Sequence, residues 1–164
     1  HDALWAALAS GVTSTVGTDH APFDFNGQKD MGKGDFTKIP NGIPSIQERI
    51  DLLHTLGVKT GRIDLNTFVR VASTNAAQIF GLKCKGTIAV GADADIVIYD
   101  PDYTHTLSAK THQSKVDYNG FEGWEVTGRS SVVAVRGKVM VRDGVFVGDE
   151  PGRGKLIHRV PTHF

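Results

Sequence analysis

The amino-acid sequence predicts an α/β protein in which a helix-rich first half is followed by an antiparallel β-rich second half. Three observations predict it. Apolar residues recur at helical spacing in the first half, whereas from about Lys85 onward they alternate with polar residues, as in half-exposed strands. Glycine-containing turns separate the later apolar runs. With 164 residues and 40% hydrophobic composition, the chain is long enough to bury a core.

A helix and a short strand come first. Apolar residues recur at helical spacing from Ala3 to Leu8, and Gly11 is expected to end the helix in a left-handed conformation. The β-branched run from Thr13 to Val16 then predicts a strand. A helix that leads into a strand is half of the alternating pattern of α/β folds.

A long loop and three helices follow. Residues 23–43 are rich in Gly, Lys and Asp without hydrophobic periodicity, and a loop of this length is usually functional or disordered. Ser45 and Glu48 predict a capping box for a helix that ends near Gly57. Two more helices are expected at about 64–73 and 74–80.

The pattern after residue 84 predicts strands. Alternating apolar residues mark four short runs, at 96–98, 133–135, 139–141 and 145–147. Turn residues at 136–138 and 143–144 join the last three runs into a β-meander. The two prolines and two glycines of the tail indicate an extended arm. The expected organisation is an α/β part at 1–84, strands at 85–150 and the arm at 151–164.

Charge and cysteine content restrict the function classes. Because 18 basic residues balance 18 acidic ones, the chain lacks the basic footprint of a nucleic-acid binder or of a polybasic membrane anchor. No apolar run is long enough to span a bilayer, and the first residues do not resemble a signal peptide. Cys84 is the one cysteine, which excludes an internal disulfide and fits a reducing compartment. A cytoplasmic location and a small neutral or zwitterionic partner are therefore expected.

Asp19 is the strongest candidate for chemistry. It follows the predicted strand at 13–16, at the carboxyl end, where barrel enzymes place their catalytic groups. A carboxylate there can bind a divalent metal and accept a proton from the water that the metal activates. The alternative is an aspartate that only forms a turn or caps a helix. His20 either orients a metal ligand or simply packs, because neighbouring residues of an extended segment point to opposite faces.

Asn41 and Gly42 close the long loop just before a helix. A backbone without a β-carbon can approach a ligand closely, and the alternative is a turn that binds no ligand. The lysines of this loop are interpreted as solvated surface. The other histidines lack metal-ligand spacing, so Asp19 is the one ligand candidate and the rest of a metal site must come from elsewhere.

Five segments together resemble a known family. They are GTDHAPF, DFTKIPNGIPSIQERIDLL, STNAAQIFGL, KGTIAVGADADIVIYDP and VDYNGFEGWEVTGR. These segments are similar to the C-terminal third of dihydropyrimidinase and D-hydantoinase, which are cyclic amidohydrolases of the amidohydrolase superfamily. The resemblance covers nearly the whole chain. It implies the C-terminal part of a TIM-like (β/α)8 barrel, followed by strands of a small β-sandwich domain, in a homotetramer.

The resemblance also implies a reaction. Family members hold two divalent metal ions, usually zinc, and a metal-bridging hydroxide opens the cyclic amide of a dihydropyrimidine or hydantoin. Asp19 matches the last metal ligand, which also carries the proton of the hydroxide to the leaving nitrogen. Asn41 matches a residue whose backbone binds the substrate ring. The other ligands and a tyrosine that supports the oxyanion precede this segment in the family, so the chain is expected to be inactive alone and to need the missing N-terminal part.

Two alternatives are not enzymes. Collapsin-response mediator proteins resemble the same family and act as scaffolds, but they carry a small residue in place of Asp19 and an acidic one in place of Asn41. Both residues are kept here, which favours the enzyme. Ala21 stands where many relatives have cysteine, which leaves the metal argument unchanged. An independent assembly domain is disfavoured, because one strand of a closed barrel would leave unpaired edges.

Overall fold

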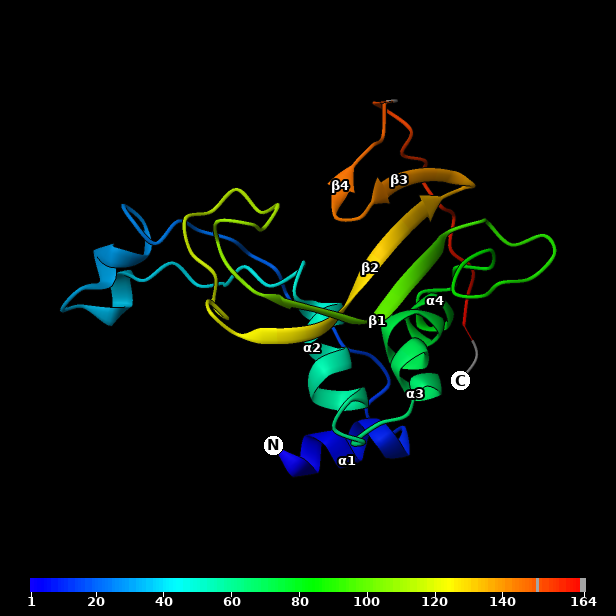
Figure 1. Cartoon of the computed structure of the whole chain (residues 1–164), viewed down its shortest axis with the longest axis horizontal. Helices are drawn as coiled ribbons and strands as arrows, with labels where there is room; N and C mark the ends of the chain where they lie inside the picture. The colour runs from blue at the N-terminus through cyan, green and yellow to red at the C-terminus, as the bar shows by residue number, and fades with distance from the viewer. Residues whose placement is uncertain (150, 163–164) are drawn as a thin grey trace.

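The computed structural model describes residues 1–149 and 151–162 and shows a mixed α/β fold. In Figure 1 the helices group below a twisted antiparallel sheet, and a long loop projects to one side. The helices are α1 (Asp2–Ser10), α2 (Arg49–Leu53), α3 (Leu65–Val69) and α4 (Asn75–Ile79). The strands are β1 (Ile96–Thr106), β2 (Glu125–Val135), β3 (Lys138–Arg142) and β4 (Val145–Phe146).

Helix α1 ends as predicted, but no strand follows it. Gly11 has a φ of 82° and donates its N–H to Leu8 O. A strand needs a neighbouring strand for its N–H and C=O groups. Here the neighbouring segments are helical, and side chains of these helices donate hydrogen bonds to the carbonyl groups of residues 13–16 instead. Arg49 Nη1 donates to Val16 O at 2.9 Å, and Asn75 Nδ2 donates to Ser14 O at 2.8 Å. The predicted strand at 13–16 is therefore wrong for the described residues.

The predicted capping box before α2 is also wrong. Ser45 Oγ donates to Thr18 O at 3.4 Å, and Glu48 accepts from Asn119 Nδ2 at 2.8 Å. Because both side chains have distant partners, neither caps the helix, and α2 begins at Arg49 without a side-chain cap. The helix continues directly into the π-helical turn η3 (His54–Val58) and so ends near Gly57, as predicted.

The next two predicted helices form one continuous run. Asp64 caps it by accepting from Thr67 N at 2.7 Å. α3 then passes through the π-helical turn η4 (Arg70–Thr74) into α4 without a break. Gly81, with a φ of 66°, follows the last turn. The sequence thus places both ends of this helical run correctly.

The sheet is a four-stranded antiparallel meander in the order β1-β2-β3-β4, which confirms the predicted connection of the last three strands. Arg136 and Gly137 have φ values of 47° and 77°, and Asp143 and Gly144 have values of 50° and 79°. Positive φ at both central residues is the geometry of the tight hairpin turn that matches the twist of the strands. β1 and β2 are longer than predicted because pairing continues past an irregularity between Asp100 and Thr104. The described residues form one sheet, so the second sheet of a sandwich is not among them.

The main core lies between the helices. Its buried members are Leu53, Ile63, Phe68 and Val71. Burying each such side chain stabilises the fold by about 1.5–3 kcal/mol. His54 extends this core to the sheet, because it is 2% exposed and its Nδ1 lies 2.6 Å from Thr127 O on β2. This histidine has a packing role.

Residues 151–162 form no helix or strand and run back toward the end of α4 (Figure 1). Val160 donates its N–H to Gly81 O at 3.1 Å. Glu150, His163 and Phe164 lie outside the described residues. Within the described part of the chain, no helix is both long and apolar enough to cross a membrane.

Candidate functional site

Asp19 lies on the segment that links α1 to the long loop. Its φ of 47° is left-handed, a conformation that aspartate tolerates better than most residues, and its side chain is exposed. No hydrogen bond or ion pair engages its carboxylate from the residues that the structure describes. The carboxylate is therefore available to a ligand.

His20 joins this segment to the residues before α2. Its Nδ1 accepts the backbone N–H groups of Ser45 at 3.0 Å and of Ile46 at 3.2 Å. Since two donors point at Nδ1, a neutral His20 ring carries its proton on Nε2. Nδ1 is thus occupied by structural hydrogen bonds and does not serve as a metal ligand in this arrangement.

Asn41 is brought to the same region by the end of the loop. Ala21 N donates to Ile43 O at 3.3 Å. Gly42 has a φ of 122°, and a β-carbon there would lie 2.5 Å from Ala21 O. Only glycine allows this close approach of the two backbones. Asp19 and Asn41 are each two residues from the Ala21–Ile43 contact, so the fold places the two predicted site residues on adjoining segments.

Lys29 was not marked by any sequence pattern, and its interpretation as solvated surface is wrong. It begins the 3₁₀ turn η1 (Lys29–Gly32), is half-buried, and donates from Nζ to the carbonyl oxygens of Pro40 and Gly42. The same ammonium lies 5.3 Å from the centre of the Phe23 ring. These contacts connect the start of the loop to its end.

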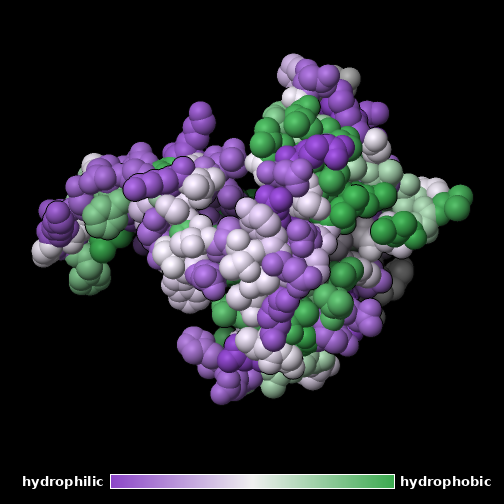
Figure 2. Space-filling view, in the orientation of Figure 1, coloured by the Kyte–Doolittle hydropathy of each residue, from purple (hydrophilic) through white to green (hydrophobic). Residues whose placement is uncertain are grey.

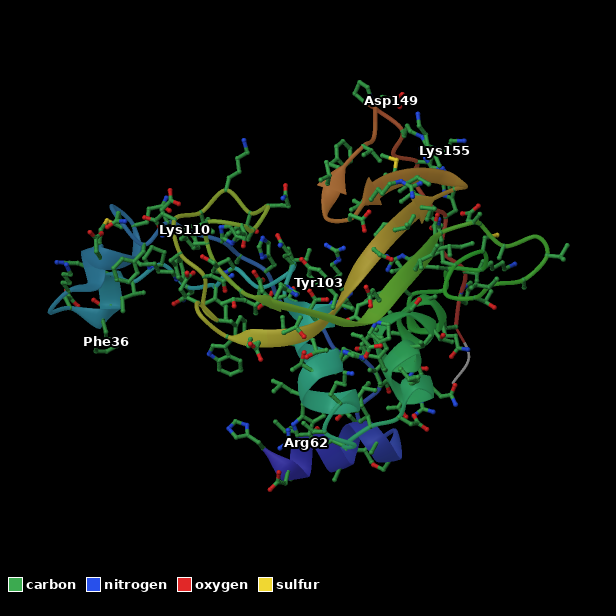
Figure 3. The ribbon with its side chains drawn as sticks, in the orientation of Figure 1. Phe36, Arg62, Tyr103, Lys110, Asp149 and Lys155 are labelled. Carbon is green, nitrogen blue, oxygen red and sulfur yellow. The ribbon has the colours of Figure 1, made fainter. Side chains whose placement is uncertain are left out.

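A second set of contacts ties the loop to the segment after β1. Asp117 accepts the backbone N–H of Phe25 at 2.5 Å and that of Asn26 at 3.0 Å. These hydrogen bonds hold the pKa of Asp117 below its usual range. The Phe25 and Tyr118 rings also meet edge to face, 6.1 Å apart. No such hydrogen bond or ring contact from the described residues reaches the tip of the loop, and Phe36, 81% exposed, points away from the body in Figure 3.

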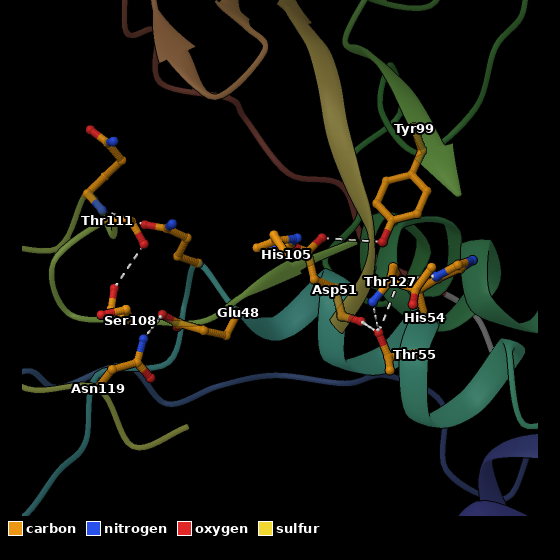
Figure 4. Close-up of polar contacts among 12 residues, drawn as sticks. Glu48, Asp51, His54, Thr55, Tyr99, His105, Ser108, Thr111, Asn119 and Thr127 are labelled. Carbon is orange, nitrogen blue, oxygen red and sulfur yellow. Dashed lines mark hydrogen bonds and ion pairs between the residues drawn. The ribbon is translucent and has the colours of Figure 1, made fainter. Parts of the chain in front are cut away.

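A cluster of ionisable groups lies between α2 and the sheet (Figure 4). Burial raises the pKa of Asp51 to about 6, and Tyr99 donates its hydroxyl to this carboxylate at 3.3 Å. His105 Nε2 lies 3.5 Å from Asp51 Oδ2. Burial and the nearby Arg129 lower the pKa of His105, which favours the neutral form of the ring beside Asp51. Asp51, His105 and Arg129 border a cavity of about 970 Å³.

The raised pKa of Asp51 implies that the stability of the folded protein depends on pH. Its folded-state pKa of about 6 exceeds the ordinary 3.8, so the folded protein binds more protons in this window and loses stability as pH rises from about 4 to 6. Asp51→Asn should remove this loss and stabilise the protein at pH 7.5 by on the order of 2 kcal/mol, with no gain at pH 3.5. Urea unfolding at the two pH values measures the difference.

Asp102→Asn is the matched control, because the Asp102 side chain is 82% exposed and its change should leave the pH dependence intact. Parallel pH profiles for the parent and Asp51→Asn would contradict the prediction.

The described residues do not form a metal site by themselves. No group of three or more His, Cys, Asp or Glu side chains converges anywhere in residues 1–149 and 151–162. Metal sites in proteins normally use three or four protein ligands. Asp19 therefore supplies at most one ligand of a larger set.

Comparison with known proteins shows the lineage. Residues 1–140 match the amidohydrolase family. The chain is 54% identical to the D-hydantoinase of Geobacillus stearothermophilus over 96% of its own length and 34% of that protein. It is 49% identical to the dihydropyrimidinase of Rattus norvegicus over 96% of the chain and 30% of that protein.

Solved structures agree. The D-hydantoinase (dihydropyrimidinase) from Thermus sp. superposes with a TM-score of 0.92 at 60% identity, covering 99% of the chain and 35% of that structure. The chain thus spans about a third of the length of the relatives that it matches. The resemblance seen in the sequence is confirmed, and the chain belongs to the amidohydrolase family, with close similarity to D-hydantoinases and dihydropyrimidinases.

Proposed function

We propose that the chain forms part of a metal-dependent hydrolase that opens the cyclic amide of a dihydropyrimidine or a hydantoin. The main support for this proposal is the similarity to D-hydantoinase and dihydropyrimidinase over 96% of the chain. The geometry is consistent with it, because the Ala21–Ile43 contact sets the exposed Asp19 and Asn41 on adjoining segments.

The proposal includes a placement of the segments. Residues 1–84 would be the C-terminal part of a (β/α)8 barrel, residues 85–150 the strands of a β-sandwich, and residues 151–164 an extended arm. The superposition of 99% of the chain on the D-hydantoinase (dihydropyrimidinase) structure from Thermus sp. supports this placement, in which residues 13–16 would belong to a barrel strand. Carboxyl-end positions of barrel strands carry catalytic groups, and Asp19 follows this segment closely.

In this proposal Asp19 has two roles. Its carboxylate is one ligand of a centre that holds two divalent metal ions, with zinc expected, and it takes a proton on one oxygen and releases it toward the leaving ring nitrogen. The metal ions would supply a water that is nucleophilic at neutral pH and would polarise the carbonyl. The main chain at Asn41 would hold the ring by hydrogen bonds, at a position set by the close approach of Gly42 to Ala21.

We also propose that the protein is a homo-oligomer, with a tetramer expected. Several large apolar side chains are exposed in the described chain, and Val12, Ile88 and Val90 are 82%, 84% and 109% exposed. Figure 2 shows hydrophobic residues gathered over the outer strands and the loop before β1. Exposed apolar surface of this kind is typical of protein contacts. A scaffold without catalysis would share this surface, so activity decides between the two functions.

The test uses the protein expressed from its complete open reading frame. With zinc, it should hydrolyse dihydrouracil or hydantoin, and a chelator should abolish the turnover. The 164-residue chain expressed alone should show no hydrolysis under the same conditions. Absence of turnover by the complete protein on every cyclic amide of a substrate panel would favour the scaffold. Turnover by the chain alone would contradict the need for further ligands.

A further inference from the structure

Three lysines lie in the loop at 23–43, and Lys29 differs from the others. Lys33 and Lys38 are exposed, whereas Lys29 is half-buried and its ammonium points at backbone carbonyls. An ammonium has three N–H donors in a compact group. Here two go to the carbonyl oxygens of Pro40 and Gly42, and the cation also faces the Phe23 ring at 5.3 Å.

The two carbonyls flank a single residue, Asn41. A trans peptide unit is planar, with its C=O and N–H pointing in opposite directions. The carbonyl of Pro40 shares its peptide plane with the N–H of Asn41. When Lys29 holds that oxygen, the Asn41 N–H must therefore point away from Lys29. The second hydrogen bond, to Gly42, fixes the chain on the other side of Asn41.

The rest of the loop is held by other groups. Asp117 binds the backbone of Phe25 and Asn26, and Ala21 binds the carbonyl of Ile43. Loss of Lys29 would thus leave the loop attached at both ends and free only the peptides around Asn41. Lys29 therefore orients the peptides around Asn41, and it is not needed to hold the loop as a whole in place.

We propose that Lys29 is a positioning residue, which holds the carbonyls of Pro40 and Gly42 and so sets the direction in which the Asn41 main chain meets a cyclic amide substrate. The proposal rests on the proposed function. It identifies the residue that orders the ring-binding backbone, and it makes the affinity for the ring depend on a lysine that never touches it.

The test is Lys29→Met in the zinc-loaded protein expressed from its complete open reading frame. Methionine keeps a long unbranched side chain but removes the donors and the charge. KM for dihydrouracil or hydantoin should rise roughly 10-fold to 100-fold, because charge-assisted hydrogen bonds are lost, while kcat should fall by less than about 5-fold. Zinc content should equal that of the parent. Lys29→Arg should recover much of the KM, since it restores donors.

Lys33→Met is the matched control, because this exposed lysine lies in the same loop, and it should leave KM unchanged. A Lys29→Met protein with parental KM would overturn the proposal, as would a Lys29→Arg protein no better than Lys29→Met.

Crystal structures of the parent and of Lys29→Met separate this proposal from the proposed function. In Lys29→Met, the Pro40–Asn41 peptide should turn or show raised B-factors, while residues 25–26, which Asp117 holds, should keep their parental positions. If the parent hydrolyses no cyclic amide, the proposed function fails, yet a change confined to residues 40–42 still supports the hold on Asn41. An unchanged Pro40–Asn41 peptide would overturn it.

Discussion

Asp19→Ala is expected to lower kcat by at least about 10³-fold in the protein expressed from its complete open reading frame. The change removes a group proposed both to bind metal and to carry the proton, and proton transfer alone typically contributes about 10²–10⁴-fold. The Asp19 side chain is exposed and supports no described contact, so the fold and the oligomer should be unaffected. Steady-state turnover and light scattering measure the two expectations.

Asp35→Ala is a suitable control, because Asp35 is another carboxylate of the long loop region and pairs locally with Lys38. This variant should keep turnover within about 3-fold of the parent, since surface ion pairs contribute little. A near-normal rate for Asp19→Ala would show that the proton-carrying role is wrong.

Asn41→Pro is expected to lower kcat/KM by about 10²-fold or more, whereas Asn41→Ala should cost less than about 5-fold. Proline removes the backbone N–H that is proposed to bind the substrate ring, and loss of one well-placed donor has effects of about 10²–10³-fold in enzymes. Alanine keeps the N–H and removes only the exposed side chain. The two variants are each other's control, and kcat/KM for a cyclic amide is the measurement.

The reverse order would show that Asn41 acts through its side-chain amide. Equal, small effects of the two substitutions would show that the Asn41 backbone does not contact the substrate. Circular dichroism and zinc content should match the parent in both variants, because the Pro40–Gly42 segment is held by Lys29 through carbonyl groups that neither substitution removes.

Local chemistry predicts the parts of this fold that depend on neighbouring residues. The hairpin turns at Arg136-Gly137 and Asp143-Gly144 follow from residues that accept positive φ, and both turns are present. Gly11 and Gly81 mark helix ends for the same reason. Such features need no information from distant parts of the chain.

Features that depend on distant partners were missed or mistaken. Ser45 and Glu48 have the spacing of a capping box, but their side chains form hydrogen bonds with the distant residues Thr18 and Asn119 instead. The run at 13–16 has the composition of a strand but no strand beside it within the described residues. The extent of β1 was missed because the apolar alternation stops before the charged stretch that begins at Asp100, although pairing with β2 resumes beyond it.

The site shows the same division. The sequence pattern marks Asp19 and Asn41 as candidates and the family resemblance gives their expected roles, and the fold adds that the Ala21–Ile43 contact brings their segments together. Lys29 could not be found from sequence, because backbone carbonyls 11 and 13 residues away leave no pattern in the residue types. Asp51 and His105 were likewise missed, since their meeting depends on how α2 packs on the sheet.

The central claim is that the Asp19 carboxylate binds metal, and anomalous diffraction at the zinc edge tests it most directly. Crystals of the protein expressed from its complete open reading frame, grown with zinc, should show an Asp19 oxygen at about 2.0–2.2 Å from a zinc ion. A zinc centre held entirely by other residues, with the Asp19 carboxylate in solvent or paired on an outer surface, would contradict the account.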